Sequence, residues 1–160
     1  MHHNKALAPK QHDRQTLIEL QQAMMTCEQQ IELPVTHRFI NGIYAREIFI
    51  PQGVLVAGRI HKTEHISVIS QGCVEVITDN VLTGEVIRDT YEAPCTFISP
   101  IGTKRMVQAV TDTVWTTFHK HEGQQTPDNI EDIYTWPDYQ AFEVEHISSA
   151  PQATLSEVTL

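Results

Sequence analysis

Two histidines lie four residues apart in the segment GRIHKTEHISVISQG (58–72), with a lysine, a threonine and Glu64 between them. Imidazole is the side chain most often used as a metal ligand, and a carboxylate beside it can transfer protons. The segment therefore has two interpretations. It is either a metal site built on His61 and His65, with Glu64 as an acid/base group or a fourth ligand, or a polar strand end tied to backbone groups.

The spacing of the two histidines sets a geometric condition on the metal interpretation. Side chains alternate along a strand, so His61 and His65 point to the same face. On a straight strand, however, residues four apart are separated by about 13 Å, which is too far for one ion with metal–nitrogen bonds of about 2.1 Å. A turn or bulge within residues 61–65 must bring the two side chains together if they bind one ion.

A third candidate ligand lies in TVWTTFH, where Trp115 and His119 share one face of the predicted strand. If that face points into the interior, His119 can join His61 and His65. Three histidines with open coordination positions suit Fe, Mn, Ni or Zn. The alternative for His119 is a half-exposed histidine at a strand end.

Basic residues define a second candidate site. Lys104 and Arg105 form the only local basic cluster in the sequence. They are either part of a solvated turn or a clamp for a small anion, because arginine offers a planar fork to carboxylate or phosphate. In YAREIFI, one strand face carries Tyr44, Arg46 and Ile48 and the other carries Ala45, Glu47 and Phe49. Both faces mix polar and apolar residues, which indicates that one of them looks into a polar pocket.

The elements that must position these residues are mainly short strands. From Val35 to about His119, runs rich in β-branched and aromatic residues alternate with turn residues, which predicts about seven or eight strands of a sandwich or barrel. Helical spacing over residues 13–32 predicts a helix capped by Asp13 or Thr16 that ends before Pro34. TPDNIEDIYTW reads as a short helix with Thr126 or Asp128 as cap, and residues 147–160 as a polar tail or partner-binding arm.

Length and composition narrow the class of protein. The chain has 160 residues, which suits one domain with an N-terminal segment 1–34, a barrel 35–122 and a C-terminal segment 123–160. Its net charge of −9 argues against a nucleic-acid partner, since phosphate neutralisation needs clustered basic residues. No apolar run long enough for a membrane span and no secretory signal are found. Three cysteines without a CxxC pair favour reduced thiols and a cytoplasmic location.

With these elements in place, about residues 40–122 resemble the cupin superfamily of small β-barrels. The first cupin motif runs glycine, H-x-H, three or four residues, glutamate, six residues, glycine. Counted back from Gly72, His65 stands at the glutamate position, His61 at the second histidine position and Arg59 at the first. In the second motif, P-x-G followed after two residues by histidine, Arg105 stands at the histidine position of PIGTKR.

The resemblance implies an all-β fold, a single cupin-like (jelly-roll) barrel with an N-terminal helix and a short C-terminal helix. Cupins bend the first motif at the barrel mouth, which would meet the geometric condition on the histidines. They often pair through barrel edges, so a homodimer or larger assembly is expected. The string YAREIFIPQG…GRIHKTEH…SPIGTKR…VWTTFHKH also resembles small cupin-like proteins of tailed-phage genomes, which implies the host cytoplasm as location.

Two classes of function follow from these interpretations. The first is a metal-dependent cupin enzyme acting on a small polar or anionic substrate. Its ion is held by His61, His65 and His119, Glu64 moves protons, and Lys104 or Arg105 fixes the substrate. The second is a non-catalytic small-molecule binder or a phage protein that interacts with host machinery or the virion. In that case Arg59 and Arg105 form an anion pocket without a metal.

Overall fold

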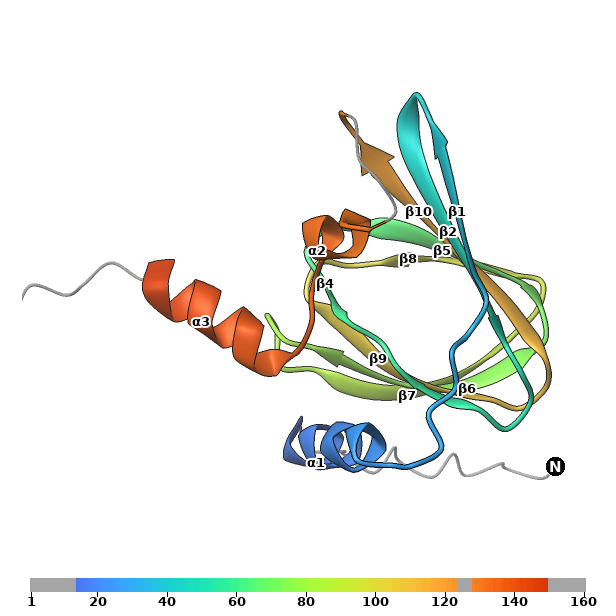
Figure 1. The fold of residues 1–160 in the computed structure, drawn as a ribbon, viewed down its shortest axis with the longest axis horizontal. Coiled ribbons are helices and arrows are strands. Elements are labelled where there is room, and N and C mark those ends of the chain that lie inside the picture. Colours follow the sequence, from blue (N-terminus) through green and yellow to red (C-terminus); the bar gives the residue numbers. More distant parts are fainter. Residues whose placement is uncertain (1–13, 124–127, 150–160) are drawn as a thin grey trace, which may run out of the picture.

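The computed structural model describes residues 14–123 and 128–149, and these form two antiparallel β-sheets that face each other (Figure 1). The first sheet has the order β1-β2-β10-β5-β8, made of Val35–Ile40, Gly42–Ile50, Thr113–His121, His65–Gln71 and Cys95–Ser99. The second has the order β3-β9-β6-β7, made of Leu55–Ala57, Thr103–Ala109, Cys73–Asn80 and Val86–Glu92. A two-stranded ribbon joins β4 and β11, made of Ile60–His61 and Thr135–Trp136. This confirms the predicted all-β barrel with an N-terminal helix and a short C-terminal helix, and a further helix follows that short one.

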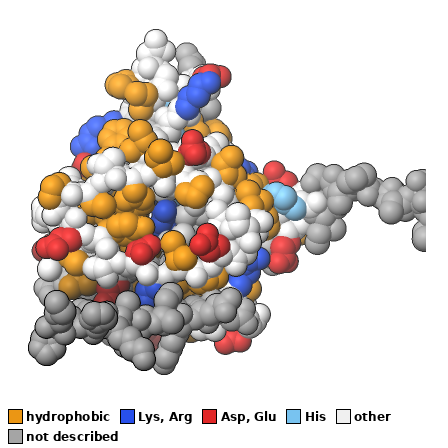
Figure 2. All heavy atoms as spheres, turned by 180° about the vertical axis from the view of Figure 1, so that it is seen from behind, with side chains coloured by type: hydrophobic (Ala, Val, Ile, Leu, Met, Phe, Trp, Pro, Cys, Tyr) orange, Lys and Arg blue, Asp and Glu red, His pale blue; other side chains and the backbone are white. Residues whose placement is uncertain are grey.

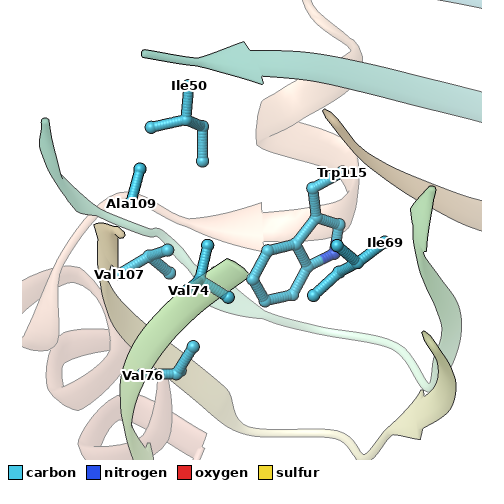
Figure 3. Close-up of a cluster of buried hydrophobic side chains, with 7 residues drawn as sticks. All are labelled: Ile50, Ile69, Val74, Val76, Val107, Ala109 and Trp115. Atoms are coloured by element: carbon cyan, nitrogen blue, oxygen red, sulfur yellow. The ribbon is translucent and has the colours of Figure 1, made fainter. Parts of the chain in front are cut away.

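The main core lies between the two sheets, where strand alternation places every second side chain. In β5, His65, Ser67 and Ile69 are buried, while Ile66 between them is exposed. Figure 3 shows the apolar side chains that meet in this space from both sheets, which are Ile50, Ile69, Val74, Val76, Val107, Ala109 and Trp115. Burial of each large side chain stabilises the fold by about 1.5–3 kcal/mol.

The helices lie outside the barrel, and all three differ from prediction in some respect. α1 (Arg14–Met25) covers the sheet that contains β6 and β7 and ends well before Pro34 (Figure 1). It ends early because the Gln30 side-chain amide donates to the carbonyls of Met24 and Cys27, which satisfies carbonyls that a longer helix would use. Thr16 lies within α1 and is not its cap, and Asp13 lies outside the described residues.

α3 (Tyr139–Ser149) was missing from the prediction, which treated residues 147–160 as a tail. Its start signal is Asp138, whose carboxylate accepts a hydrogen bond from the Ala141 backbone N–H at 2.8 Å. The predicted short helix is present as α2 (Ile130–Tyr134), but Asn129 rather than Asp128 stands at its N-cap position. Thr126 and residues 150–160 lie outside the described part of the chain.

A second apolar cluster joins the helices to the barrel. Ile60, Val81, Trp136 and Tyr139 are buried together, with Ile18 of α1 and Phe142 of α3 packed against them. Beside this cluster, Asp79 accepts hydrogen bonds from the Arg14 guanidinium and from the Tyr139 hydroxyl. The two helices are therefore held at one point of β6.

Figure 2 shows one face of the barrel surface. The face of the barrel in Figure 2 has hydrophobic side chains at its centre and acidic side chains along its lower margin, with scattered basic ones. In the described residues, no helix is both long and apolar enough to cross a membrane.

Candidate metal centre

The bend that the metal interpretation requires is present between His61 and His65. β4 ends at His61, the chain turns over residues 62–64, and β5 begins at His65. Backbone hydrogen bonds hold this turn: the Lys62 N–H donates to the Tyr134 carbonyl at 2.8 Å, and the His61 carbonyl accepts from the Gly102 N–H at 2.8 Å. As a result the two imidazole rings have centroids only 4.1 Å apart.

His119 completes the cluster from β10, which lies between β2 and β5. The face that His119 shares with Trp115 points inward, and both side chains are buried. The His119 ring centroid is 4.6 Å from that of His65 and 5.8 Å from that of His61. One ring nitrogen from each of the three histidines lies within 4.8 Å of the others. The structure therefore brings together all three predicted ligands.

The unpaired nitrogens of this cluster fit a metal ion. His61 Nδ1, His65 Nε2 and His119 Nδ1 are buried and have no hydrogen-bond partner among the described residues. The other nitrogen of His65, Nδ1, lies 3.2 Å from the Thr63 carbonyl, so it carries the proton and leaves the Nε2 lone pair free. Buried polar atoms are rarely left unpaired, and histidine ligands commonly donate their second nitrogen to such a carbonyl.

Burial also keeps these imidazoles in the form that binds metals. It lowers the pKa of His65 to about 4 and that of His119 to about 3, and it holds the pKa of His61 well below its usual value. The proximity of His65 and Arg105 lowers the pKa of His61 further. All three rings are therefore neutral near pH 7, and a metal ion meets no competing proton.

The cluster lies in a cavity of about 340 Å³ inside the barrel, which is small for a ligand pocket. One face of β2 was predicted to look into a polar pocket, and the structure shows that it is the face of Tyr44, Arg46 and Ile48, which line this cavity. Its apolar wall is formed by side chains from both sheets, which are Ile48, Ile50, Val56, Val107 and Trp115.

Arg105 is the buried cation of this cavity. Its side chain lies over the rings of Phe97 and Trp115, with Cζ at 5.3 Å and 5.9 Å from their centroids. It is 9% exposed, and burial lowers its pKa to about 10. Arg59 also lines the cavity, but its guanidinium pairs with Asp132 at 2.5 Å.

Two of the predicted catalytic residues lie away from the cavity. Glu64 is exposed in the turn after His61 and is not among the cavity-lining residues. Lys104 is buried, but alternation along β9 directs it to the opposite face from Arg105. There its Nζ donates to the Gly58 carbonyl at 2.6 Å and lies 5.3 Å from the Tyr139 ring centroid. Neither residue takes part in the site as the structure builds it.

The segment that covers the site was not predicted from the sequence to line it. Ile130, Glu131, Tyr134 and Thr135 of α2 and β11 line the cavity. The Tyr134 ring centroid lies 4.9 Å from that of His119, and its hydroxyl donates to the Lys120 carbonyl at 2.7 Å. The available signal was the spacing of Ile130 and Tyr134, four residues apart on one helix face, which is typical of a buried face.

Comparisons with known proteins found similarity at the level of structure. No family model and no curated protein matches the sequence. A recombinant oxalate oxidase in complex with glycolate is similar with a TM-score of 0.49 and 15% identity, over 61% of this chain and 55% of that one. The chain thus spans about half the length of that oxalate oxidase.

Two shorter proteins are also similar. One is a cupin superfamily protein from Desulfitobacterium hafniense, with a TM-score of 0.46 and 9% identity over 62% of this chain and 87% of the other. The other is an RmlC-like cupin family protein with a double-stranded β-helix fold from Methanocaldococcus jannaschii, with a TM-score of 0.42 and 12% identity over 57% and 81%. These proteins are similar to this chain in fold.

Proposed function

We propose that this chain is a metal-dependent enzyme that acts on a small polar or anionic molecule in the barrel cavity, with one Fe, Mn, Ni or Zn ion held by His61, His65 and His119. The observation that supports this most directly is the cluster of three neutral imidazoles, each of which has one buried nitrogen without a hydrogen-bond partner. When bound, such an ion supplies Lewis-acid polarisation of a substrate or an activated water.

The protein's own contribution is the environment of the cavity. The apolar wall of the cavity excludes water and lowers the local dielectric constant, which strengthens each polar contact made inside. Its side chains are those of Ile48, Ile50, Val56, Val107 and Trp115. The Thr63 carbonyl orients the His65 ring, and the Thr117 hydroxyl lies 3.1 Å from His119 Nε2. These contacts hold the rings in place before any ligand arrives.

A non-catalytic binding protein is the second candidate, and one observation favours it. Among the described cavity-lining residues, Glu131 is the one carboxylate, and it pairs with Arg46 at 2.9 Å and with Arg59 at 3.7 Å. A carboxylate held in two ion pairs is committed to those partners rather than to a substrate. In this alternative the histidine cluster and arginines bind a small molecule without transforming it.

The first test is metal content per chain in protein purified without an affinity tag. We expect a ratio near one for a single transition metal. The His61→Ala/His65→Ala double variant should lose the metal while keeping its circular dichroism spectrum. The matched control is His146→Ala, because His146 lies on α3 outside the cavity. Unchanged metal content in the double variant would overturn the proposal, and bound metal without turnover of any substrate would favour the second candidate.

An origin in a tailed phage, a homodimer and a cytoplasmic location remain predictions drawn from the resemblance and the composition. The oligomeric state is checked by analytical ultracentrifugation of the purified chain.

A further inference from the structure

We infer that Arg105 is the anchor for a substrate carboxylate, and that the natural ligand of the cavity is a short monocarboxylate with an apolar body. This deepens the proposed function and rests on it for the reaction at the histidine end of the cavity. The carboxylate contact itself requires only Arg105.

The first argument is charge compensation. Arg46 and Arg59 are balanced by Glu131 and Asp132, with which they form ion pairs of 2.9 Å and 2.5 Å. The Arg105 guanidinium has no hydrogen-bond or ion-pair partner among the described residues, and its Nε is buried and unpaired. A buried guanidinium is costly unless it is paired, so the site calls for an anion from outside the described residues.

The neighbours of Arg105 do not supply that anion. Tyr91 and Asp89 act on the Arg105 pKa only through their charges, and no ion pair joins Arg105 to Asp89 among the described residues. Asp89 instead accepts a hydrogen bond from the Tyr91 hydroxyl at 3.4 Å. The three histidines nearby carry no negative charge, and a divalent ion bound to them would add positive charge. The cavity is therefore electrostatically prepared for a negative ligand.

The shape and lining of the cavity select among anions. A single available guanidinium matches a singly charged, planar carboxylate, which it can bind through two parallel hydrogen bonds. A phosphate carries more charge and more acceptors than this one group satisfies. The wall beside Arg105 is apolar, with Val107, Trp115 and Ile50, and the volume of about 340 Å³ admits only a small molecule. A carboxylate with a short hydrocarbon chain fits this cavity, because its charged group can bind Arg105 and its chain can pack against the apolar wall.

The test measures binding of acetate, propionate, butanoate and pentanoate by isothermal titration calorimetry, to metal-loaded protein and to protein treated with EDTA. Propionamide serves as the neutral analogue, and inorganic phosphate as the competing anion. The variants are Arg105→Gln, which removes the charge, and Arg105→Lys, which keeps the charge but not the fork. Arg88→Gln is the matched control, because Arg88 is an exposed arginine on β7.

We expect at least one carboxylate to bind the wild-type chain saturably and propionamide not to bind. Arg105→Gln should weaken that binding by about 10–100-fold, as loss of a charge-assisted hydrogen bond implies, with Arg105→Lys in between and Arg88→Gln unchanged. The inference would be overturned if Arg105→Gln or Arg105→Lys bound the carboxylate as tightly as the wild type. It would also be overturned if no carboxylate bound, or if phosphate bound as tightly as the best carboxylate.

Metal content measured on the same samples separates this inference from the proposed function. If the wild-type chain binds no metal but binds a carboxylate through Arg105, the proposed enzyme fails and the anchor stands. If metal is bound at one ion per chain but carboxylate affinity does not depend on Arg105, the metal site stands and the anchor fails.

Discussion

His119 on β10 and His65 on β5 face each other across neighbouring strands, with ring centroids 4.6 Å apart. The register places Phe118 opposite Ile66, so the two histidines occupy the next pair of positions, on the inner face. A shift of one residue in this register would turn one of the histidines to the outside. The pairing of β5 with β10 therefore builds the candidate metal centre.

The first prediction concerns the stability of the metal-free protein at acidic pH. In the unfolded chain the histidines bind protons near a pKa of about 6.5. In the folded chain burial lowers the pKa of His65 to about 4 and that of His119 to about 3. At pH values between the folded and the unfolded pKa, the unfolded chain binds more protons than the folded chain. The free energy of unfolding should thus fall as pH falls, by about 1.4 kcal/mol per pH unit for each histidine.

This contribution is fully present above the unfolded pKa and is lost as pH falls toward the folded pKa. Urea unfolding of EDTA-treated protein between about pH 7.5 and about pH 4.5 measures it. The His65→Gln/His119→Gln double variant is the control that isolates the two groups, and its pH dependence should be shallower. Equal slopes for the variant and the wild type would contradict the prediction.

The second prediction concerns Glu131, whose carboxylate neutralises Arg46 and Arg59 at the cavity. The Glu131 side chain is 39% exposed, so Glu131→Gln should change the free energy of unfolding by no more than about 1 kcal/mol. The substitution frees positive charge beside the cavity. Propionate should therefore bind more tightly, and the gain should shrink with added salt.

Calorimetric titration with propionate at low and high salt measures the effect of Glu131→Gln. Glu75→Gln is the matched control, since Glu75 is exposed on β6 and does not line the cavity. Weaker propionate binding in Glu131→Gln would show that Glu131 holds α2 in place rather than opposing the anion.

The third prediction concerns Asp79, which is 0% exposed and accepts hydrogen bonds from Arg14 at 2.8 Å and from Tyr139 at 2.9 Å. Asp79→Ala leaves the Tyr139 hydroxyl without its acceptor and Arg14 without its counter-charge. We expect Asp79→Ala to lower the free energy of unfolding by about 3 kcal/mol. This is the lower end of the range for breaking a buried ion pair, because Arg14 is partly exposed. Urea unfolding measures it, with Glu75→Ala expected to stay within about 0.5 kcal/mol.

The fourth prediction concerns the turn between β5 and β6. Gly72 has a φ of 89°, and a Cβ there would lie 2.3 Å from the Asp112 carbonyl oxygen. Gly84 has a similar φ of 75° but open space around it. Gly84→Ala should cost only the left-handed backbone penalty of about 1–2 kcal/mol. Gly72→Ala should cost clearly more, because backbone atoms must also move, and similar thermal unfolding of the two variants would refute this.

Much of the fold could be predicted from the sequence because it depends on local regularities. Alternating β-branched residues and single glycines between short runs indicated strands and turns. Trp115 and His119 share one strand face, and so do Tyr44 and Arg46. This follows from the two-residue period of a strand alone. Helix ends were less predictable, because side chains such as Gln30 and Asp138 decide them by contacts that propensity does not encode.

The candidate ligands His61, His65 and His119 were identified from residue type and spacing, and Arg105 from its position in a motif. Only the tertiary structure decided that the chain turns after His61, that the Trp115 face is the inner one, and that Arg105 rather than Lys104 enters the cavity. Local sequence fixes which side chains share a face, but not which face is buried. That choice depends on how two sheets and α2 close around a common space, and on the free energy of burying every side chain on that face together.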